Sequence, residues 1–160
     1  MVVSLTGPAH DFGGGGTDVD AALQWIIDQV RGCTSCSTKI DVVILRSSGS
    51  NGYNDYIYAM NGVDSVETLV ITSARDANTA AVEATVRNAE VVFFAGGDQC
   101  DYVKYFKGTK VETAVESVYA RGGGVGGTSA GTAILGEFTT TAATAARPRR
   151  TPWPTPTIAG

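Results

Sequence analysis

The strongest chemical signal in the sequence is a serine between two glycines, in the stretch Gly127-Thr128-Ser129-Ala130-Gly131. This stretch follows a Gly/Val-rich run typical of a strand and precedes an apolar helix start at 132–135. A G-x-S-x-G turn between a strand and a helix strains the serine backbone and exposes the hydroxyl, and its neighbours must be small. The pattern predicts that Ser129 is a nucleophile and that the Ala130 N–H can stabilise an oxyanion. A structural Gly-Ser turn is the alternative.

A second group of polar residues, Gly96-Gly97-Asp98-Gln99, directly follows the apolar run 91–95. Two glycines at the end of a strand allow a backbone N–H to face the same reacting oxygen, and the Gln99 amide can hold a substrate carboxylate or amide. An ordinary turn in which Asp98 caps the next helix explains the pattern equally well. Tyr53 lies beside another glycine-rich turn and is a candidate to line the pocket, with core or loop packing as the alternative.

A serine hydroxyl needs a general base, because it is almost entirely protonated at neutral pH. His10 is the only histidine and follows the first predicted strand, Val2–Leu5. A loop after that strand lies at the same sheet edge as Ser129, so His10 is the candidate base, with a surface or packing role as the alternative. Lys104, Asp98 or a histidine of another subunit are further candidates.

Short β-rich runs alternate with helical patterns along the chain. Helices of this length between strands require right-handed crossovers, which place helices on both faces of a mostly parallel sheet. The sequence therefore predicts a doubly wound α/β fold whose ligands bind beyond the carboxyl ends of the strands. The expected strands are 2–5, 41–46, 66–71, 91–95 and a short one before Ser129, and the expected helices are 19–30, 53–60, 76–89 and 110–121.

The composition fits one folded domain. The chain has 160 residues, of which 43% are hydrophobic and 18% charged, which excludes a disordered acidic chain and a coiled coil. No window holds about 18 uninterrupted apolar residues, so no membrane span is expected. The net charge of −4 without a basic block argues against nucleic-acid binding. The amino-terminal residues lack the pattern of a secretory signal, and we expect a cytoplasmic protein.

The cysteines and glycine runs do not predict a metal or cofactor. Cys33 and Cys36 form a single CxxC that follows a helix, without the second ligand pair of a zinc site, and a reduced loop is the favoured interpretation. The runs 13–16 and 122–127 lack the lysine of a P-loop, and acidic residues beside the first would repel a pyrophosphate. We therefore expect neither a metal nor a nucleotide cofactor.

Four motifs occur in order along the chain. They are Gly14-Gly-Gly-Thr-Asp18 with Gln24-Trp25, Arg46-Ser-Ser-Gly-Ser-Asn-Gly-Tyr-Asn54, Gly96-Gly-Asp-Gln99, and Gly126-Gly-Thr-Ser-Ala-Gly131 with Ile134-Leu-Gly. Together they resemble cyanophycinase and its relatives in serine peptidase family S51, which includes α-aspartyl dipeptidases. The resemblance runs from about Gly14 to Phe138 and implies a class I glutamine amidotransferase-like α/β fold. It also implies a serine exopeptidase or isopeptidase that cleaves beside aspartyl residues.

The resemblance implies roles for five residues. By this correspondence Ser129 is the nucleophile, Gly97 and Ala130 supply oxyanion N–H groups, and Asp98 and Gln99 lie at the substrate pocket. The expected reaction is acyl transfer from a small peptide or another amide or ester. The alternative is a catalytically inactive remnant that acts as a binding or self-associating scaffold.

The carboxyl-terminal stretch departs from the family pattern. In the relatives the catalytic histidine lies a few tens of residues beyond the nucleophile, whereas here four of five prolines fall in the last thirteen residues of a Thr/Ala/Pro/Arg-rich stretch. We predict a C-terminally truncated S51-like domain over 1–138 and a low-complexity tail of non-family sequence over 139–160. Truncation would leave an open sheet edge and an apolar face, so we expect a homo-oligomer and a broadened substrate range.

Overall fold

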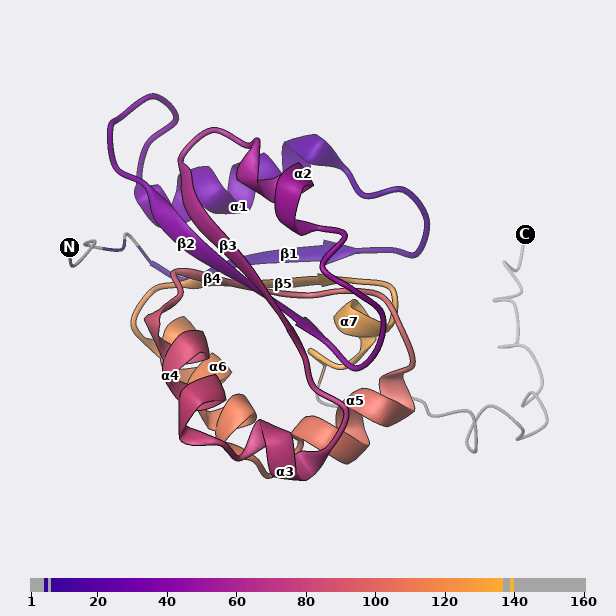
Figure 1. Cartoon of the computed structure of the whole chain (residues 1–160). Coiled ribbons are helices and arrows are strands. Elements are labelled where there is room, and N and C mark those ends of the chain that lie inside the picture. Colours follow the sequence, from indigo (N-terminus) through magenta and orange to yellow (C-terminus); the bar gives the residue numbers. More distant parts are fainter. Residues whose placement is uncertain (1–4, 6, 137–138, 140–160) are drawn as a thin grey trace, which may run out of the picture.

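The computed structural model describes residues 5, 7–136 and 139, which form a five-stranded sheet with helices on both faces (Figure 1). The strands lie in the order β1-β5-β4-β2-β3, and every pairing is parallel. The predicted doubly wound α/β architecture is therefore confirmed. The strands are β1 Ala9–Gly13, β2 Ile40–Arg46, β3 Val63–Val70, β4 Val91–Phe94 and β5 Gly124–Thr128.

The helices divide between the two faces of the sheet. Figure 1 shows α1 and α2 on one face and α3, α4, α5 and α6 on the other, with the short α7 after β5 on the second side. The helices are α1 Asp20–Arg31, α2 Asn54–Tyr58, α3 Ala74–Ala77, α4 Ala80–Asn88, α5 Gln99–Phe106, α6 Lys110–Ala120 and α7 Ala130–Ala133. In the described part of the chain, no helix is long and apolar enough to cross a membrane.

From the neighbouring parallel strands β2 and β4, the chain continues toward opposite edges of the sheet. From β2 the chain continues through α2 to β3, whereas from β4 it continues through α5 and α6 to β5 on the other side. The two connections lie on opposite faces of the sheet, so the loops that leave β2 and β4 diverge (Figure 1). Such a switch point is where open α/β sheets bind their ligands.

The core consists of two hydrophobic layers separated by the sheet. Successive side chains of a strand point to opposite faces, so β2 contributes Ile44 to one layer and Leu45 to the other. Both side chains are 0% exposed, which explains why β2 has an apolar run without alternation. Ile26 and Val30 of α1 fill the first layer, and α4, α5 and α6 fill the second.

The first strand lies later in the chain than the sequence predicts. Val2–Ser4 of the predicted strand Val2–Leu5 lie outside the described residues, and the strand that pairs with β5 is Ala9–Gly13. This segment has no continuous apolar run, because it is an edge strand that pairs on one side only. His10 is therefore a strand residue and not part of the loop after the first strand.

Three further expectations need correction. The helix predicted over 76–89 is two helices, because Thr79 starts α4 by accepting a hydrogen bond from the Val82 N–H. Helix α5 was not predicted at all. Cys33 and Cys36 are joined by a disulfide and do not form the reduced loop favoured from the sequence.

Candidate active site

Ser129 joins β5 to α7 in a strained backbone conformation. Its φ of 53° and ψ of −120° make it the only residue other than glycine with a positive φ in the described part of the chain. Such a conformation costs about 1–3 kcal/mol and persists only where the surroundings enforce it. Ser129 is exposed, although Thr128 and Ala130 on either side are each 5% exposed. The turn thus holds a single hydroxyl out of an otherwise buried segment.

Close backbone packing enforces this turn. A Cβ added to Gly131 would overlap the Phe94 carbonyl oxygen, and one added to Gly127 would lie 2.7 Å from the Gly131 carbonyl carbon. Gly126 is confined in the same way, since its Cβ would lie 2.7 Å from the Asp11 carbonyl oxygen. The small residues of the G-x-S-x-G motif are therefore required by the approach of α7 to β4 and β5.

The loop after β1 is hydrogen-bonded to the serine turn. The Ser129 N–H donates to the Gly13 carbonyl oxygen at 3.2 Å, and the Thr128 hydroxyl donates to the Gly14 carbonyl oxygen at 2.9 Å. The Thr132 hydroxyl lies 2.6 Å from the Gly13 and 2.5 Å from the Gly127 carbonyl oxygen, so it bridges the loop and β5. Next along this loop, a Cβ on Gly15 would lie 3.5 Å from Ser129 Oγ.

The end of β4 forms the other side of the site. The position of a Cβ on Gly96 is 3.6 Å from Ser129 Cβ, whereas the corresponding position on Gly97 is 3.5 Å from Ser47 Oγ. Gly96 is therefore the glycine in contact with Ser129, and Gly97 lies toward β2. Asp98 caps α5 by accepting a hydrogen bond from the Cys100 N–H at 2.7 Å, and Gln99 is the first residue of α5.

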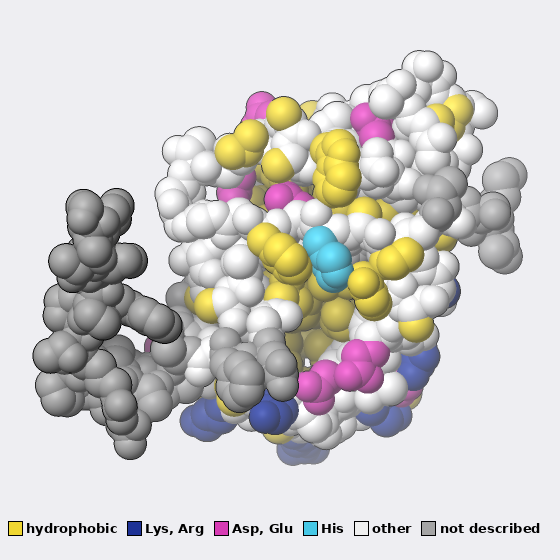
Figure 2. All heavy atoms as spheres, turned by 180° about the vertical axis from the view of Figure 1, so that it is seen from behind, with side chains coloured by type: hydrophobic (Ala, Val, Ile, Leu, Met, Phe, Trp, Pro, Cys, Tyr) yellow, Lys and Arg dark blue, Asp and Glu magenta, His cyan; other side chains and the backbone are white. Residues whose placement is uncertain are grey.

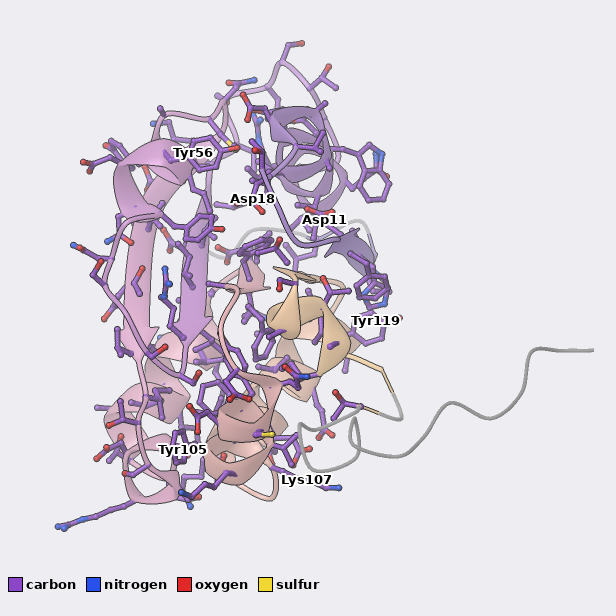
Figure 3. All side chains as sticks on the ribbon, turned by 90° about the vertical axis from the view of Figure 1, so that its right-hand side faces the viewer. Asp11, Asp18, Tyr56, Tyr105, Lys107 and Tyr119 are labelled. Carbon is purple, nitrogen blue, oxygen red and sulfur yellow. A yellow bond between two sulfur atoms is a disulfide. The ribbon has the colours of Figure 1, made fainter. Side chains whose placement is uncertain are left out.

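Two carboxylates lie beside the serine turn on the α1 face of the sheet. Asp11 and Asp18 line a cavity of about 240 Å³ together with Gly14, Thr128 and other residues, and Figure 3 shows the two aspartates near each other. Burial, with a smaller contribution from Asp18, raises the pKa of Asp11 above its ordinary value. The Tyr53 hydroxyl donates to Asp18 Oδ2 at 2.5 Å, and burial together with this bond raises the pKa of Tyr53.

His10 is not brought to Ser129. It lies in β1 three residues before Gly13, about 10 Å along the strand from the residue that contacts Ser129. Its ring stacks between Phe12 and Tyr119, with ring centroids 5.0 and 4.8 Å away. Figure 2 shows the histidine at the surface with hydrophobic side chains on both sides. The packing role, which the sequence left as the alternative, describes this arrangement.

A larger cavity of about 630 Å³ lies away from the serine, among α5, α6 and the residues after α7. Its walls include Phe94, Phe106, Val111 and Leu135, and Ser129 is not among the lining residues. Ser129 therefore lies outside the larger cavity. Among the described residues, no group of three or more His, Cys, Asp or Glu side chains is arranged to hold a metal ion.

Comparison with known proteins identifies the family. Residues 47–159 match the model of Peptidase family S51, which is more than half of the chain. The chain belongs to peptidase family S51. Comparison with curated proteins gives no significant match.

A solved structure supports the fold of this S51 chain. It is similar to the crystal structure of a peptidase from an acI-B1 Actinobacterium, with a TM-score of 0.65 and 17% sequence identity. The match covers 83% of this chain and 58% of the other, so the chain spans little more than half the length of that structure. At this identity the likeness concerns the fold alone, while the family match supports a peptidase function.

Several residues around Ser129 were not predicted from the sequence. In the sequence analysis, Asp11 counted only as an acidic residue that would repel a phosphate, and Asp18 appeared otherwise only in the motif Gly14-Gly-Gly-Thr-Asp18. Gly15 and Thr132 were not singled out as neighbours of Ser129. The glycine run directly after a strand was the available signal, because such loops lie at the carboxyl edge of a parallel sheet.

Proposed function

We propose that the chain is a serine hydrolase that transfers an acyl group from an amide or ester to Ser129 and then to water. The observation that carries this proposal is the strained, exposed Ser129 between β5 and α7. Strain of this kind at a strand-to-helix serine is typical of nucleophiles. Membership of peptidase family S51 supports the same reaction class.

The reaction has two acyl-transfer steps. Ser129 Oγ bonds to the carbonyl carbon as its proton passes to a base, and the negative charge moves to the carbonyl oxygen. The N–H groups of Ala130 and Gly97 are the proposed oxyanion donors. Ala130 begins α7, where the first N–H groups have no intrahelical partner, and Gly97 takes this role from the motif resemblance. The bond to the leaving amine or alcohol breaks as that group takes up the proton. Water then attacks in the same manner, releases the acid and restores the hydroxyl.

None of the candidate general bases among the described residues is an evident partner of Ser129. His10 is stacked against Tyr119, Asp98 caps α5, and Lys104 lies over the Tyr105 ring with its Nζ 5.3 Å from the centroid. In a homo-oligomer a histidine of a second subunit is the His10 of that copy, since the chain has no other, and we retain the proposal that it completes the site.

Self-association is proposed for a second reason. Both edges of the described sheet, β1 and β3, are open, and Phe12 on β1 is 55% exposed. Open edges and exposed aromatic side chains favour association. Sedimentation velocity at micromolar concentration should show a homo-oligomer, and a well-folded monomer would contradict the proposal.

The proposed substrates are short peptides with an aspartyl residue at the cleaved bond, as in cyanophycinase and the aspartyl dipeptidases. This finer assignment rests on the motif resemblance, in which Asp98 and Gln99 lie at the substrate pocket. Other small amides or esters are included as alternative substrates of the same acyl-transfer reaction.

The hydrolase and the inactive scaffold are distinguished by covalent labelling. A fluorophosphonate should label the protein, peptide mass mapping should place the adduct on Ser129, and Ser129→Ala should abolish it. Ser48→Ala is the matched control, because Ser48 is an exposed serine of the β2 loop with an ordinary backbone. His10→Ala removes the only histidine from every copy, so it should slow labelling of Ser129 strongly if the His10 of a second copy is the base, and labelling within about twofold would show that its role is packing alone. No labelling of the wild-type protein would support the scaffold.

A further inference from the structure

The carboxyl end of β2 places Arg46 and Ser47 beside the proposed active site. Leu45 pairs with Phe94, so the two residues after Leu45 lie beside the turn that follows β4. Contacts connect this point to the serine, because Ser47 Oγ lies against Gly97, while Gly96 lies against Ser129. Strands β2 and β5 are two strand spacings apart, which is about 10 Å. This is also the switch point of the sheet, where a ligand crevice is expected.

The Arg46 guanidinium is held in a fixed position at this crevice. Its Nε donates to the Ser48 carbonyl oxygen at 3.0 Å, and its Cζ lies 5.8 Å from the centroid of the Tyr53 ring. Gly49 has a φ of +91°, and a Cβ there would lie only 2.9 Å from an Arg46 terminal nitrogen. A half-buried, pre-oriented guanidinium loses little entropy when it binds a ligand.

The two terminal nitrogens of Arg46 are not used within the described part of the chain. They make no hydrogen bond to a described residue, and no described carboxylate lies within 4.0 Å of the guanidinium. Arg31 shows the contrast, since its nitrogens donate to Asp28 and to the carbonyl oxygens of Thr38, Cys36 and Asn61. Arg31 is a structural arginine, whereas Arg46 has donors available.

The charges of the surrounding side chains determine which chemical group of a ligand can bind at Arg46. On the same face of the sheet, Tyr53 lies between the guanidinium and Asp18, which lines a cavity with Asp11. The row Arg46, Tyr53 and Asp18 therefore has a positive charge at one end and a negative charge at the other. An anionic group is repelled from the aspartates and attracted to Arg46, whose planar fork matches a carboxylate.

We propose that Arg46 is a specificity-determining residue whose terminal nitrogens bind a carboxylate of the peptide that acylates Ser129. The inference rests on the proposed hydrolase function. The carboxylate belongs either to the aspartyl side chain or to the carboxyl terminus of a short peptide, and both bring the same chemistry to the guanidinium. The side-chain source and the terminal source are separated by substrate pairs that differ in one group.

The first experiment compares kcat/KM for Asp-Leu, Asn-Leu and Asp-Leu-amide. In the wild-type protein, one of the two carboxylates should raise kcat/KM roughly 10- to 100-fold over the analogue in which that group is uncharged. Arg46→Gln should reduce this preference to about one, and Arg46→Lys should retain part of it. Lys39→Gln is the matched control, because it removes one positive charge directly before the opposite end of the same strand, β2.

The outcomes separate a specificity role from a structural one. If Arg46 only supports the loop 47–52, Arg46→Gln lowers kcat/KM for the charged and uncharged substrates by the same factor, which would overturn the inference. If the ratio of kcat/KM between charged and uncharged substrates is unchanged in Arg46→Gln, the inference is overturned as well. Thermal unfolding of each variant shows whether the fold is retained, and Arg46→Lys keeps the test available if Arg46→Gln unfolds.

A binding experiment separates failure of this inference from failure of the proposed function. Succinate is titrated into Ser129→Ala with or without Arg46→Gln, and binding is followed by NMR chemical shifts, so no catalysis is required. The Arg46→Gln change should raise the Kd at least about tenfold. An equal Kd in both proteins overturns the inference even if the wild type hydrolyses peptides. An inactive wild type that still shows the difference contradicts only the hydrolase proposal.

Discussion

The backbone N–H of Ser129 donates a hydrogen bond to the Gly13 carbonyl oxygen, so the serine turn is tied directly to the loop that leaves the edge strand β1. Thr132 reinforces this connection, because its hydroxyl reaches the carbonyl oxygens of both Gly13 and Gly127. Two segments more than a hundred residues apart in the chain thereby share one set of hydrogen bonds. The position of the Ser129 hydroxyl depends on the β1 loop as much as on its own motif.

Thr132→Val tests this dependence. The substitution keeps the shape but leaves two carbonyl oxygens without their hydroxyl partner, so the free energy of unfolding should fall by about 1–3 kcal/mol. Fluorophosphonate labelling of Ser129 should slow at the same time. Thr113→Val serves as the control, because Thr113 is an exposed residue of α6, and it should change both quantities little. A destabilised variant with wild-type labelling would mean that Thr132 does not position the serine.

Gly131→Ala tests the backbone packing of the site. A methyl group there overlaps the Phe94 carbonyl oxygen, so we expect a loss of about 3 kcal/mol or more in the free energy of unfolding by urea. Gly14→Ala is the matched comparison, since a Cβ on Gly14 meets no atom within 4 Å and should be tolerated. Equal stability of the two variants would contradict the close approach of α7 to β4.

Asp11→Asn should show a pH-dependent gain in stability. Burial and Asp18 raise the pKa of Asp11 in the folded protein above its ordinary value of 3.8, so the native state holds this proton more tightly than the unfolded state. The stability from Asp11 is therefore present below pH 3.8 and is lost as the pH rises through the raised pKa. Urea unfolding should show Asp11→Asn more stable than wild type at pH 7 and equal to it at about pH 3.

Exposed Glu67 on β3 provides the control for this prediction, because Glu67→Gln removes the same charge away from Asp18. Its effect on stability should be small at both pH values. A wild-type protein that is more stable than Asp11→Asn at pH 7 would show that the folded state favours the ionised carboxylate.

Ser47→Ala should be neutral or stabilising, which is unusual for a buried polar residue. Ser47 is 4% exposed, and its hydroxyl oxygen has no hydrogen-bond partner among the described residues. Removing an unsatisfied buried hydroxyl should leave the free energy of unfolding unchanged or raise it by about 1 kcal/mol. Equilibrium urea unfolding measures the difference. A loss greater than about 1 kcal/mol would indicate a partner outside the described residues.

The architecture could be predicted because its signals are local. The apolar runs of β2 and β4 and the serine turn before α7 each identify an element without knowledge of its neighbours. Strand β1 could not be predicted in this way, since Ala9–Gly13 has no apolar run and becomes a strand only by pairing with β5. Helix α5 is short, and its apolar side chains Tyr102 and Phe106 give a single i, i+4 pair.

For the same reason, only some residues of the candidate site could be predicted from the sequence. Ser129 and the glycines after β4 lie in recognisable motifs, and the order of the elements places them at one edge. The position of His10 depended on the bounds of β1, and the shift of that strand places the ring on the α6 side beside Tyr119. The pairing of Asp18 with Tyr53 depends on how two loops fold toward each other, which no local pattern encodes.

The glycine-rich strand β5 has a consequence for how the site can change its substrate. Around Ser129, atoms of the main chain fill the space that side chains occupy in other strands, so positions 126, 127 and 131 offer almost no room for variation. New specificity must then come from the loops 14–18 and 47–53, where Gly14 and Gly52 meet no neighbouring atom within 4 Å. A mutant library intended to redirect the proposed activity should randomise those two loops and keep the serine turn fixed.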